Sequence, residues 1–191
     1  KKKKWGIMNS RILKSNKVFS EFASERGMNL TCFAVGETQL IAQATKDLFI
    51  ERFAGLGSLI GPHFHHRPKE AILPVVQESY FPHIPRVRAK GILEPFSHGI
   101  ARYVPWECQE VKGSLKAHLS SDMKVGDMSL ESLEGFKFQM DLEVSIQQNG
   151  LLLDYKIDAE KPSVLGLHYY YTLVTGGRVQ GDIEPVYSVG G

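Results

Sequence analysis

The chain has 191 residues, of which 42% are hydrophobic and 23% are charged, and its formal net charge is +2. A chain of this length can bury a core without a disulfide scaffold, and its composition excludes collagen-like and disordered classes. No stretch reaches the ~18–20 apolar residues of a membrane helix. Removing the four leading lysines from the 23 basic residues leaves 19 against 21 acidic ones. We predict one domain over 1–191, a basic disordered terminus over 1–4, no nucleic-acid partner and no membrane association.

The two cysteines, Cys32 and Cys108, lie far apart and neither belongs to a Cys-x-x-Cys pair. This spacing argues against a zinc ribbon or a redox pair and predicts buried, reduced thiols. Reduced thiols are typical of cytosolic proteins, so we predict a cytoplasmic location.

Strand patterns dominate the first fifty residues. Val18–Ala23 alternates apolar and polar residues, and Leu30–Val35 is a short apolar run that Gly36-Glu37 can turn into Gln39–Ala42. Ser10–Val18 is a weaker strand candidate. Helical turns are expected only at Thr45–Phe49 and Ser129–Leu133. The region 55–105 contains seven prolines and little periodicity, which predicts a long irregular segment of the kind that often carries function.

The second half of the chain contains the clearest strand signal. Phe136–Gln147 alternates, Asn149-Gly150 is a typical hairpin turn, and alternation resumes from Leu151, so Phe136–Asp158 is predicted to be a long antiparallel hairpin. Gly166–Val174 is predicted to be another strand, and Val104–Val111 a weaker one. Together these elements predict an all-β fold, an antiparallel β-sandwich or barrel.

Five of the seven histidines lie between Gly61 and His98. On an extended strand His63 and His65 would point the same way, and two imidazoles at that spacing can chelate a metal. The stretch Gly57–Glu70 resembles the first motif of the cupins, although the second cupin motif is missing. A cupin-like metal enzyme is therefore one alternative, and loop histidines that pack or form hydrogen bonds are the other.

The segment Ser97–Trp106 places His98, Arg102 and Trp106 at intervals of four residues. An Arg fork binds phosphate or hydroxyls, and an indole can stack on a sugar, so this segment suits an anionic or hydroxylated ligand. A core tryptophan beside a surface arginine is the alternative interpretation.

A third candidate is His168, which precedes three tyrosines. Strand alternation places His168 and Tyr170 on one face and Tyr169 and Tyr171 on the other. If the first face lines a cleft, His168 can donate a proton; otherwise it is a structural histidine.

Three blocks in this order resemble the aldose 1-epimerase family, the galactose mutarotase-like proteins. They are the Gly/Pro-rich segment Phe53–Arg67, the motif His98-Gly99-x-x-Arg102 followed by Trp106, and Gly166-x-His168-x-Tyr170. Gly27 stands where the family keeps a turn glycine. The resemblance covers nearly all of the chain.

This resemblance implies a β-supersandwich that interconverts the α and β anomers of a hexose, with no metal or cofactor. It implies that His168 is the acid that protonates the ring oxygen and that His98 assists by hydrogen bonding near that oxygen. Substrate-binding roles fall to Arg67, Arg102, Trp106 and Tyr170. The sequence around His98 resembles the hexose-6-phosphate mutarotase branch of the family more closely. In that branch Arg102 would lie near the phosphate of the substrate, a small-molecule sugar phosphate.

The chain also departs from the family pattern. His66 stands where the family has Asn, and Tyr169 and Tyr171 replace its Pro and Phe. The family's catalytic glutamate lies well downstream of the second histidine, whereas this sequence ends 23 residues after His168. Neither Glu184 nor Asp182 has the marks of that base. We therefore expect that C-terminal strands are lacking and that a missing segment or a partner chain completes the sheet. A carbohydrate-binding relative without turnover is the main alternative function.

Overall fold

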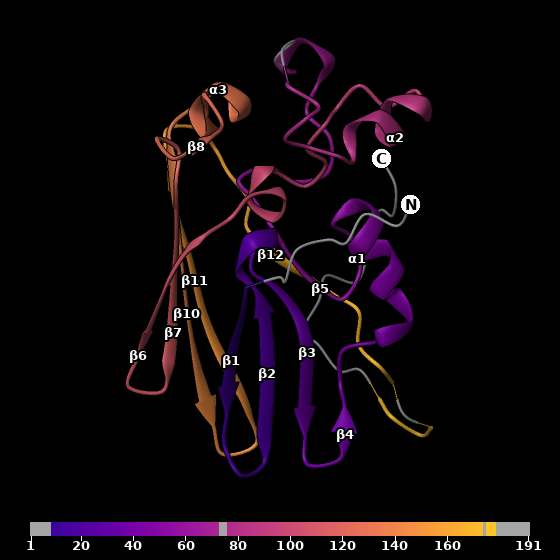
Figure 1. Ribbon diagram of the computed structural model, residues 1–191, viewed down its shortest axis with the longest axis vertical. Coiled ribbons are helices and arrows are strands. Elements are labelled where there is room, and N and C mark those ends of the chain that lie inside the picture. The colour runs from indigo at the N-terminus through magenta and orange to yellow at the C-terminus, as the bar shows by residue number, and fades with distance from the viewer. Residues whose placement is uncertain (1–8, 73–75, 174, 179–191) are drawn as a thin grey trace.

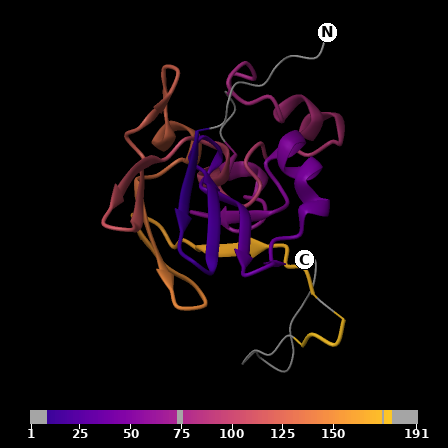
Figure 2. The same ribbon diagram turned by 60° about the horizontal axis from the view of Figure 1, so that its bottom comes forward.

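Two antiparallel β-sheets pack face to face around one hydrophobic core in the computed structural model, which describes residues 9–72, 76–173 and 175–178 (Figure 1). The prediction of an all-β antiparallel sandwich is confirmed. Figure 2 shows that the helices over residues 46–52 and 84–89 lie together on one flank of the strands. The predicted basic terminus at 1–4 lies outside the described residues.

The first sheet contains both the first and the last strand of the described chain, at its opposite edges. Its strands, in spatial order, are β1 (Ser10–Lys14), β2 (Val18–Ala23), β3 (Asn29–Val35), β5 (Gly57–Ile60) and β12 (Gly166–Tyr169), with β4 (Thr38–Gln39) paired to β3. The strand predicted over Gly166–Val174 is shorter than expected. Beyond Tyr169, the described residues make one isolated bridge, between Tyr171 and Ile41, because the chain has passed the end of its partner β5.

The second sheet is built on the predicted hairpin. Its spatial order is β11 (Gly150–Ala159), β10 (Phe138–Gln147), β7 (Ser114–Ser120) and β6 (Glu107–Val111), and β8 (Lys124–Val125) and β9 (Met128–Ser129) form a separate pair. The hairpin turn lies one residue earlier than predicted, since Gln147 pairs with Gly150. The alternation of β10 is confirmed, because Phe138, Met140, Leu142 and Val144 all face the core.

Helices α1 (Lys46–Arg52) and α3 (Leu130–Glu134) occur where helical turns were predicted. Helix α2 (Ile84–Ala89) was missed, because Pro85 suggested a loop. Proline is favoured in the first turn of a helix, where its absent N–H costs nothing. The region 55–105 is otherwise mostly irregular, apart from β5 and two 3₁₀ turns. The described 3₁₀ turns are η1 (Ser24–Arg26), η2 (Gln43–Thr45), η3 (Lys69–Ala71) and η4 (Ile100–Tyr103).

Both sheets contribute to the core. Phe22 and Leu30 from the first sheet and Leu115 and Met140 from the second are at most 1% exposed. Burial of each such side chain stabilises the fold by roughly 1.5–3 kcal/mol.

The remaining chain-wide predictions concern the thiols and the membrane. Cys32 and Cys108 are both free, as predicted, but half-buried rather than buried. Burial raises the pKa of each thiol. No helix in the described ranges is long and apolar enough to cross a bilayer.

Candidate functional site

A cavity of about 530 Å³ opens between α1, α2, the turn before η4 and β12; we call it the site cavity. Its size is that of a small-molecule pocket, which typically measures ~300–1,000 Å³. Four of the six predicted site residues line it, namely His98, Arg102, His168 and Tyr170. Segments more than sixty residues apart in sequence therefore meet at one site.

The backbone holds His98 in one orientation. Its φ angle of 66° is left-handed, and its N–H donates to the carbonyl of His65 at 2.7 Å. In return, the N–H of His65 donates to Nδ1 of His98 at 3.0 Å. Because Nδ1 accepts a hydrogen bond, the proton of the neutral imidazole lies on Nε2. His98 therefore offers a hydrogen-bond donor at Nε2.

Both site histidines are neutral at pH 7. Burial, followed by the charge of Arg102, lowers the pKa of His98 to about 4. The same two causes lower the pKa of His168 from its usual value. The two imidazoles are thus mainly neutral at pH 7, and the cationic form is the minority form in this cavity.

Strand β12 places His168 opposite Ser58 of β5, and the residue is exposed. Its ring lies 5.7 Å from that of His98 at an interplanar angle of 25°, and its edge contacts Tyr170 at 5.1 Å. On the opposite face Tyr169 packs against Tyr171. The predicted division of these residues between two faces is confirmed, and His168 and Tyr170 share the face that lines the site cavity.

Arg102 is a buried cation that faces the site cavity. It is 7% exposed, and its Nη2 donates to the Tyr103 hydroxyl at 2.6 Å. Its Nε has no hydrogen-bond partner among the described residues, and no described carboxylate forms an ion pair with it. A buried charge without a counter-ion is costly, so this guanidinium suits an anionic ligand.

Other charges around the site cavity reinforce this preference. Arg52, Arg86 and Lys90 also line it, and their only acidic neighbours in the lining are Glu51 and Glu94. Glu51 forms an ion pair with Arg86 at 3.7 Å. The lining described here is therefore net positive.

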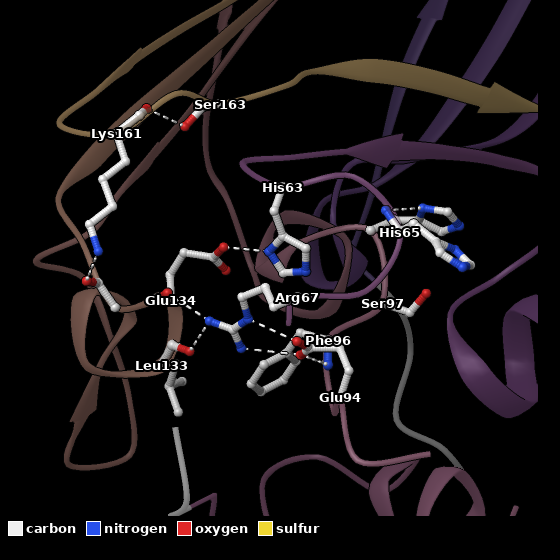
Figure 3. A network of polar contacts seen from close by, with 12 residues as sticks. His63, His65, Arg67, Glu94, Phe96, Ser97, Leu133, Glu134, Lys161 and Ser163 are labelled. Atoms are coloured by element: carbon white, nitrogen blue, oxygen red, sulfur yellow. Dashed lines mark hydrogen bonds and ion pairs between the residues drawn. The ribbon is translucent and has the colours of Figure 1, made fainter. Parts of the chain in front are cut away.

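Arg67 does not line the site cavity, contrary to the expectation that it binds sugar hydroxyls. Its Nε and Nη2 donate to the Glu94 carboxylate at 2.8 and 3.1 Å. Its Nη1 donates to the carbonyls of Leu133 and Glu134 at 3.1 and 2.6 Å (Figure 3). This guanidinium joins the loop that carries His65 to the C-terminal end of α3, and its role here is structural.

Trp106 is also placed differently from the prediction. Its side chain is in the core at 4% exposure, its Nε1 donates to the carbonyl of Ala101 at 2.8 Å, and its ring packs near Tyr155. An indole enclosed in this way cannot stack on a ligand. The alternative interpretation was right about a core tryptophan and wrong about a surface arginine, since Arg102 is also buried.

The proposed metal pair is separated. His63 lies in an irregular loop and its Nδ1 is 2.5 Å from the Glu134 carboxylate (Figure 3). His65 instead lies against the rings of His66 and His98. Within the described ranges, no group of three or more His, Cys, Asp or Glu side chains is arranged to hold a metal ion. The cupin-like alternative therefore lacks structural support.

Two residues of this site had no assigned role in the sequence analysis. His83 is 1% exposed and lines the site cavity; its Nε2 donates to the carbonyl of Pro95 at 2.7 Å, and its ring stacks on Tyr103. His66 lines the same cavity. The clustering of histidines over 61–98 was the only sequence signal for either residue.

No protein-family model and no curated protein matches the sequence. Several solved structures resemble it in fold, and two of them come from Synechocystis and Clostridium. The Slr1438 protein from Synechocystis sp. PCC 6803 has a TM-score of 0.59 and 16% identity, over 86% of this chain and 55% of that one. A galactose mutarotase-like protein from Clostridium acetobutylicum has a TM-score of 0.55 and 9% identity, over 85% of this chain and 50% of that one.

At these identities the likeness shows the fold alone. The fold is a galactose mutarotase-like β-sandwich, as the sequence resemblance predicted. The chain spans about half the length of these two structures.

Proposed function

We propose that this protein binds a hexose 6-phosphate in the site cavity and interconverts its α and β anomers. The observation that carries the proposal is the meeting of a buried guanidinium, whose Nε lacks a described partner, with two neutral imidazoles in one cavity. The likeness in fold to a galactose mutarotase-like protein supports a sugar as the ligand.

Charge and hydrogen bonding suggest how the sugar phosphate would bind. The phosphate would accept hydrogen bonds from Arg102, since charge-assisted bonds to phosphate are among the strongest in proteins. The donor at Nε2 of His98 would then bond to an oxygen of the sugar ring. The edge of Tyr170 lies beside His168 and would contact the same sugar.

The reaction needs one proton removed and one added. The C1 hydroxyl loses its proton, the bond between C1 and the ring oxygen breaks, and the ring oxygen gains a proton to give the open aldehyde. Rotation about the C1–C2 bond and the reverse steps give the other anomer. In this proposal His168 acts in its protonated form, which its lowered pKa makes the minority form at pH 7. It donates that proton to the ring oxygen and recovers it on closure, and His98 stabilises the same oxygen by a hydrogen bond.

The carboxylates that line the described cavity are already engaged. Glu51 pairs with Arg86. Glu94 is held by Arg67 and the N–H of Phe96; burial tends to raise its pKa, but these hydrogen bonds keep the pKa below its usual value. A water would therefore accept the C1 proton, and the absence of a positioned base typically costs ~10²–10⁴ in rate. Asp182 and Glu184 lie outside the described residues.

The same observation favours a second candidate, a sugar-phosphate-binding protein without turnover. Exchange NMR between anomers separates the two, using glucose 6-phosphate, glucose and galactose with and without EDTA. Acceleration for glucose 6-phosphate that survives EDTA supports the mutarotase. Saturable binding without acceleration supports the binding protein. Neither binding nor acceleration for any of the three sugars would contradict both.

A further inference from the structure

Strand β11 forms an open edge of the second sheet. It pairs with β10 over all ten of its residues without a bulge, and it is the terminal strand of that sheet in the described part of the chain. The other terminal strands are β1 and β6 with five residues each and β12 with four. A long regular edge of this kind is a template for pairing with another strand.

The hydrogen-bond alternation shows which residues of β11 face that open edge. Glu160 N donates to the carbonyl of Lys137 at 3.0 Å, so these two residues form a hydrogen-bonded pair. Along an antiparallel ladder, hydrogen-bonded pairs alternate with non-hydrogen-bonded pairs. Even-numbered residues of β11 therefore bond to β10. The residues that turn their N–H and C=O outward are Leu151, Leu153, Tyr155, Ile157 and Ala159, none of which has a backbone partner among the described residues.

The side chains of these same five residues form an apolar row on the core side of the sheet. All are only partly buried, although they pack against the core. The equivalent inward residues of β10 are completely buried, as Met140 and Val144 show. The core is therefore incompletely covered along β11, and a further strand at this edge would bury more of it.

We propose that β11 pairs with β11 of a second copy of this chain, antiparallel about a two-fold axis at Tyr155. Tyr155 then lies opposite Tyr155 of the second copy, and Leu153 lies opposite Ile157 of that copy. On the solvent face Asp154 lies opposite Lys156 of the second copy, and the symmetry makes this pair twice. Two four-stranded sheets become one eight-stranded sheet, and the closed symmetry limits the assembly to a dimer.

The charges select this register. Odd-numbered residues must lie opposite odd-numbered residues, because only these direct their hydrogen bonds outward. An axis at Asp154, Lys156 or Asp158 satisfies this condition but places that residue opposite its own copy, a like-charge pair. An axis at Ile157 places Asp154 opposite Glu160, a like-charge pair, and an axis at Leu153 places Asp154 opposite Leu152. Only the axis at Tyr155 places acidic residues opposite basic residues without creating a like-charge pair. Opposite charges on facing residues stabilise the pairing of two strands.

A charge reversal tests both the interface and its register. The wild-type protein is expected to be a dimer in sedimentation velocity measurements over a concentration series. Lys156→Asp places two acidic pairs across the axis and should weaken the dimer by at least about tenfold. The double variant Asp154→Lys/Lys156→Asp restores both pairs and should restore the dimer. Lys116→Glu, on the same sheet face but away from the edge, is the matched control.

Cysteine crosslinking tests the register independently. Opposite residues in a non-hydrogen-bonded pair have Cα atoms ~4.5 Å apart, within disulfide range. A mixture of the Asp154→Cys and Lys156→Cys proteins should therefore crosslink more than either variant alone. A monomer at all concentrations, a dimer unaffected by Lys156→Asp, or crosslinking that favours like with like would each overturn the proposal.

Discussion

The backbone N–H of His65 donates to Nδ1 of His98 at 3.0 Å, and this contact distinguishes the two imidazoles of the site. It leaves His98 with its proton on Nε2, so that His98 acts as a donor only. No described contact sets the tautomer of His168 in this way. The proposed reaction therefore assigns the proton transfer to His168.

Replacement of His168 by alanine tests its role as the acid. We expect anomer exchange of glucose 6-phosphate to fall by ~10²–10⁴, because a general acid acts in the transition state. The dissociation constant of glucose 6-phosphate should change little. Exchange NMR and calorimetry measure the two quantities. His118→Ala, on the outer face of the second sheet, is the control, and an unchanged exchange rate in His168→Ala would contradict the assignment.

Replacement of Arg102 by methionine tests phosphate recognition. Hydrogen bonds to charged groups contribute ~1.5–3 kcal/mol, so affinity for glucose 6-phosphate should fall about 10- to 100-fold. Affinity for free glucose should change much less. Tyr103→Phe keeps the guanidinium and removes its hydroxyl partner, which separates phosphate binding from local packing. Equal losses for both sugars would show that Arg102 does not bind phosphate.

Acidification should destabilise the protein through His83. Burial lowers its folded-state pKa to about 4, despite the opposing hydrogen bond to Pro95, whereas an unfolded histidine titrates near ~6.5. The unfolded chain therefore binds the proton more readily between these values, and the free energy of unfolding falls as the pH drops from 6.5 toward 4, by up to about 3 kcal/mol.

Urea unfolding of the wild type and of His83→Gln at several pH values measures this dependence. Glutamine keeps a donor for the Pro95 carbonyl but does not titrate. The free energy of unfolding of the variant should vary less with pH over this range. Parallel curves for the two proteins would exclude His83 as the source of the acid sensitivity.

Replacement of Arg67 by methionine should lower the free energy of unfolding without directly affecting sugar binding. It leaves the Glu94 carboxylate, which is 2% exposed, without its counter-ion, and such a loss costs about 3–5 kcal/mol. Adding Glu94→Leu removes the unpaired charge and should recover part of the loss. Urea unfolding gives both values. A normal stability combined with lost glucose 6-phosphate binding would instead make Arg67 a ligand-binding residue.

Replacement of Gly27 by alanine tests the packing behind Arg102. Gly27 has a φ of 67°, and a Cβ there would lie 2.2 Å from Cα of Arg102. Gly36→Ala is the control, since Gly36 has a φ of 59° but open space around it. We expect the control to lose ~1–2 kcal/mol of unfolding free energy and Gly27→Ala to lose more, because its backbone neighbour cannot move away. Equal losses in thermal unfolding would refute the steric explanation.

The sequence by itself determined the elements whose signals are local. Alternation along Phe136–Gln147 and again from Leu151 predicted a hairpin over Phe136–Asp158, which is the β10–β11 hairpin of the structure. This signal is local because the side chains of a strand point to its two faces in turn, whatever the strand packs against. The same periodicity placed His168 and Tyr170 on one face. The His98–Arg102 spacing likewise predicted two residues that line the site cavity.

Only the tertiary structure decided which of the candidate residues face that cavity. Trp106 belongs to the same motif as His98, and Arg67 to another motif of the same resemblance, yet Trp106 lies in the core and Arg67 binds Glu94. Periodicity shows which residues share one face of a strand, but not which segment of the chain will cover that face. That outcome depends on contacts between distant segments, such as the pairing of β12 with β5 that brings His168 beside His98.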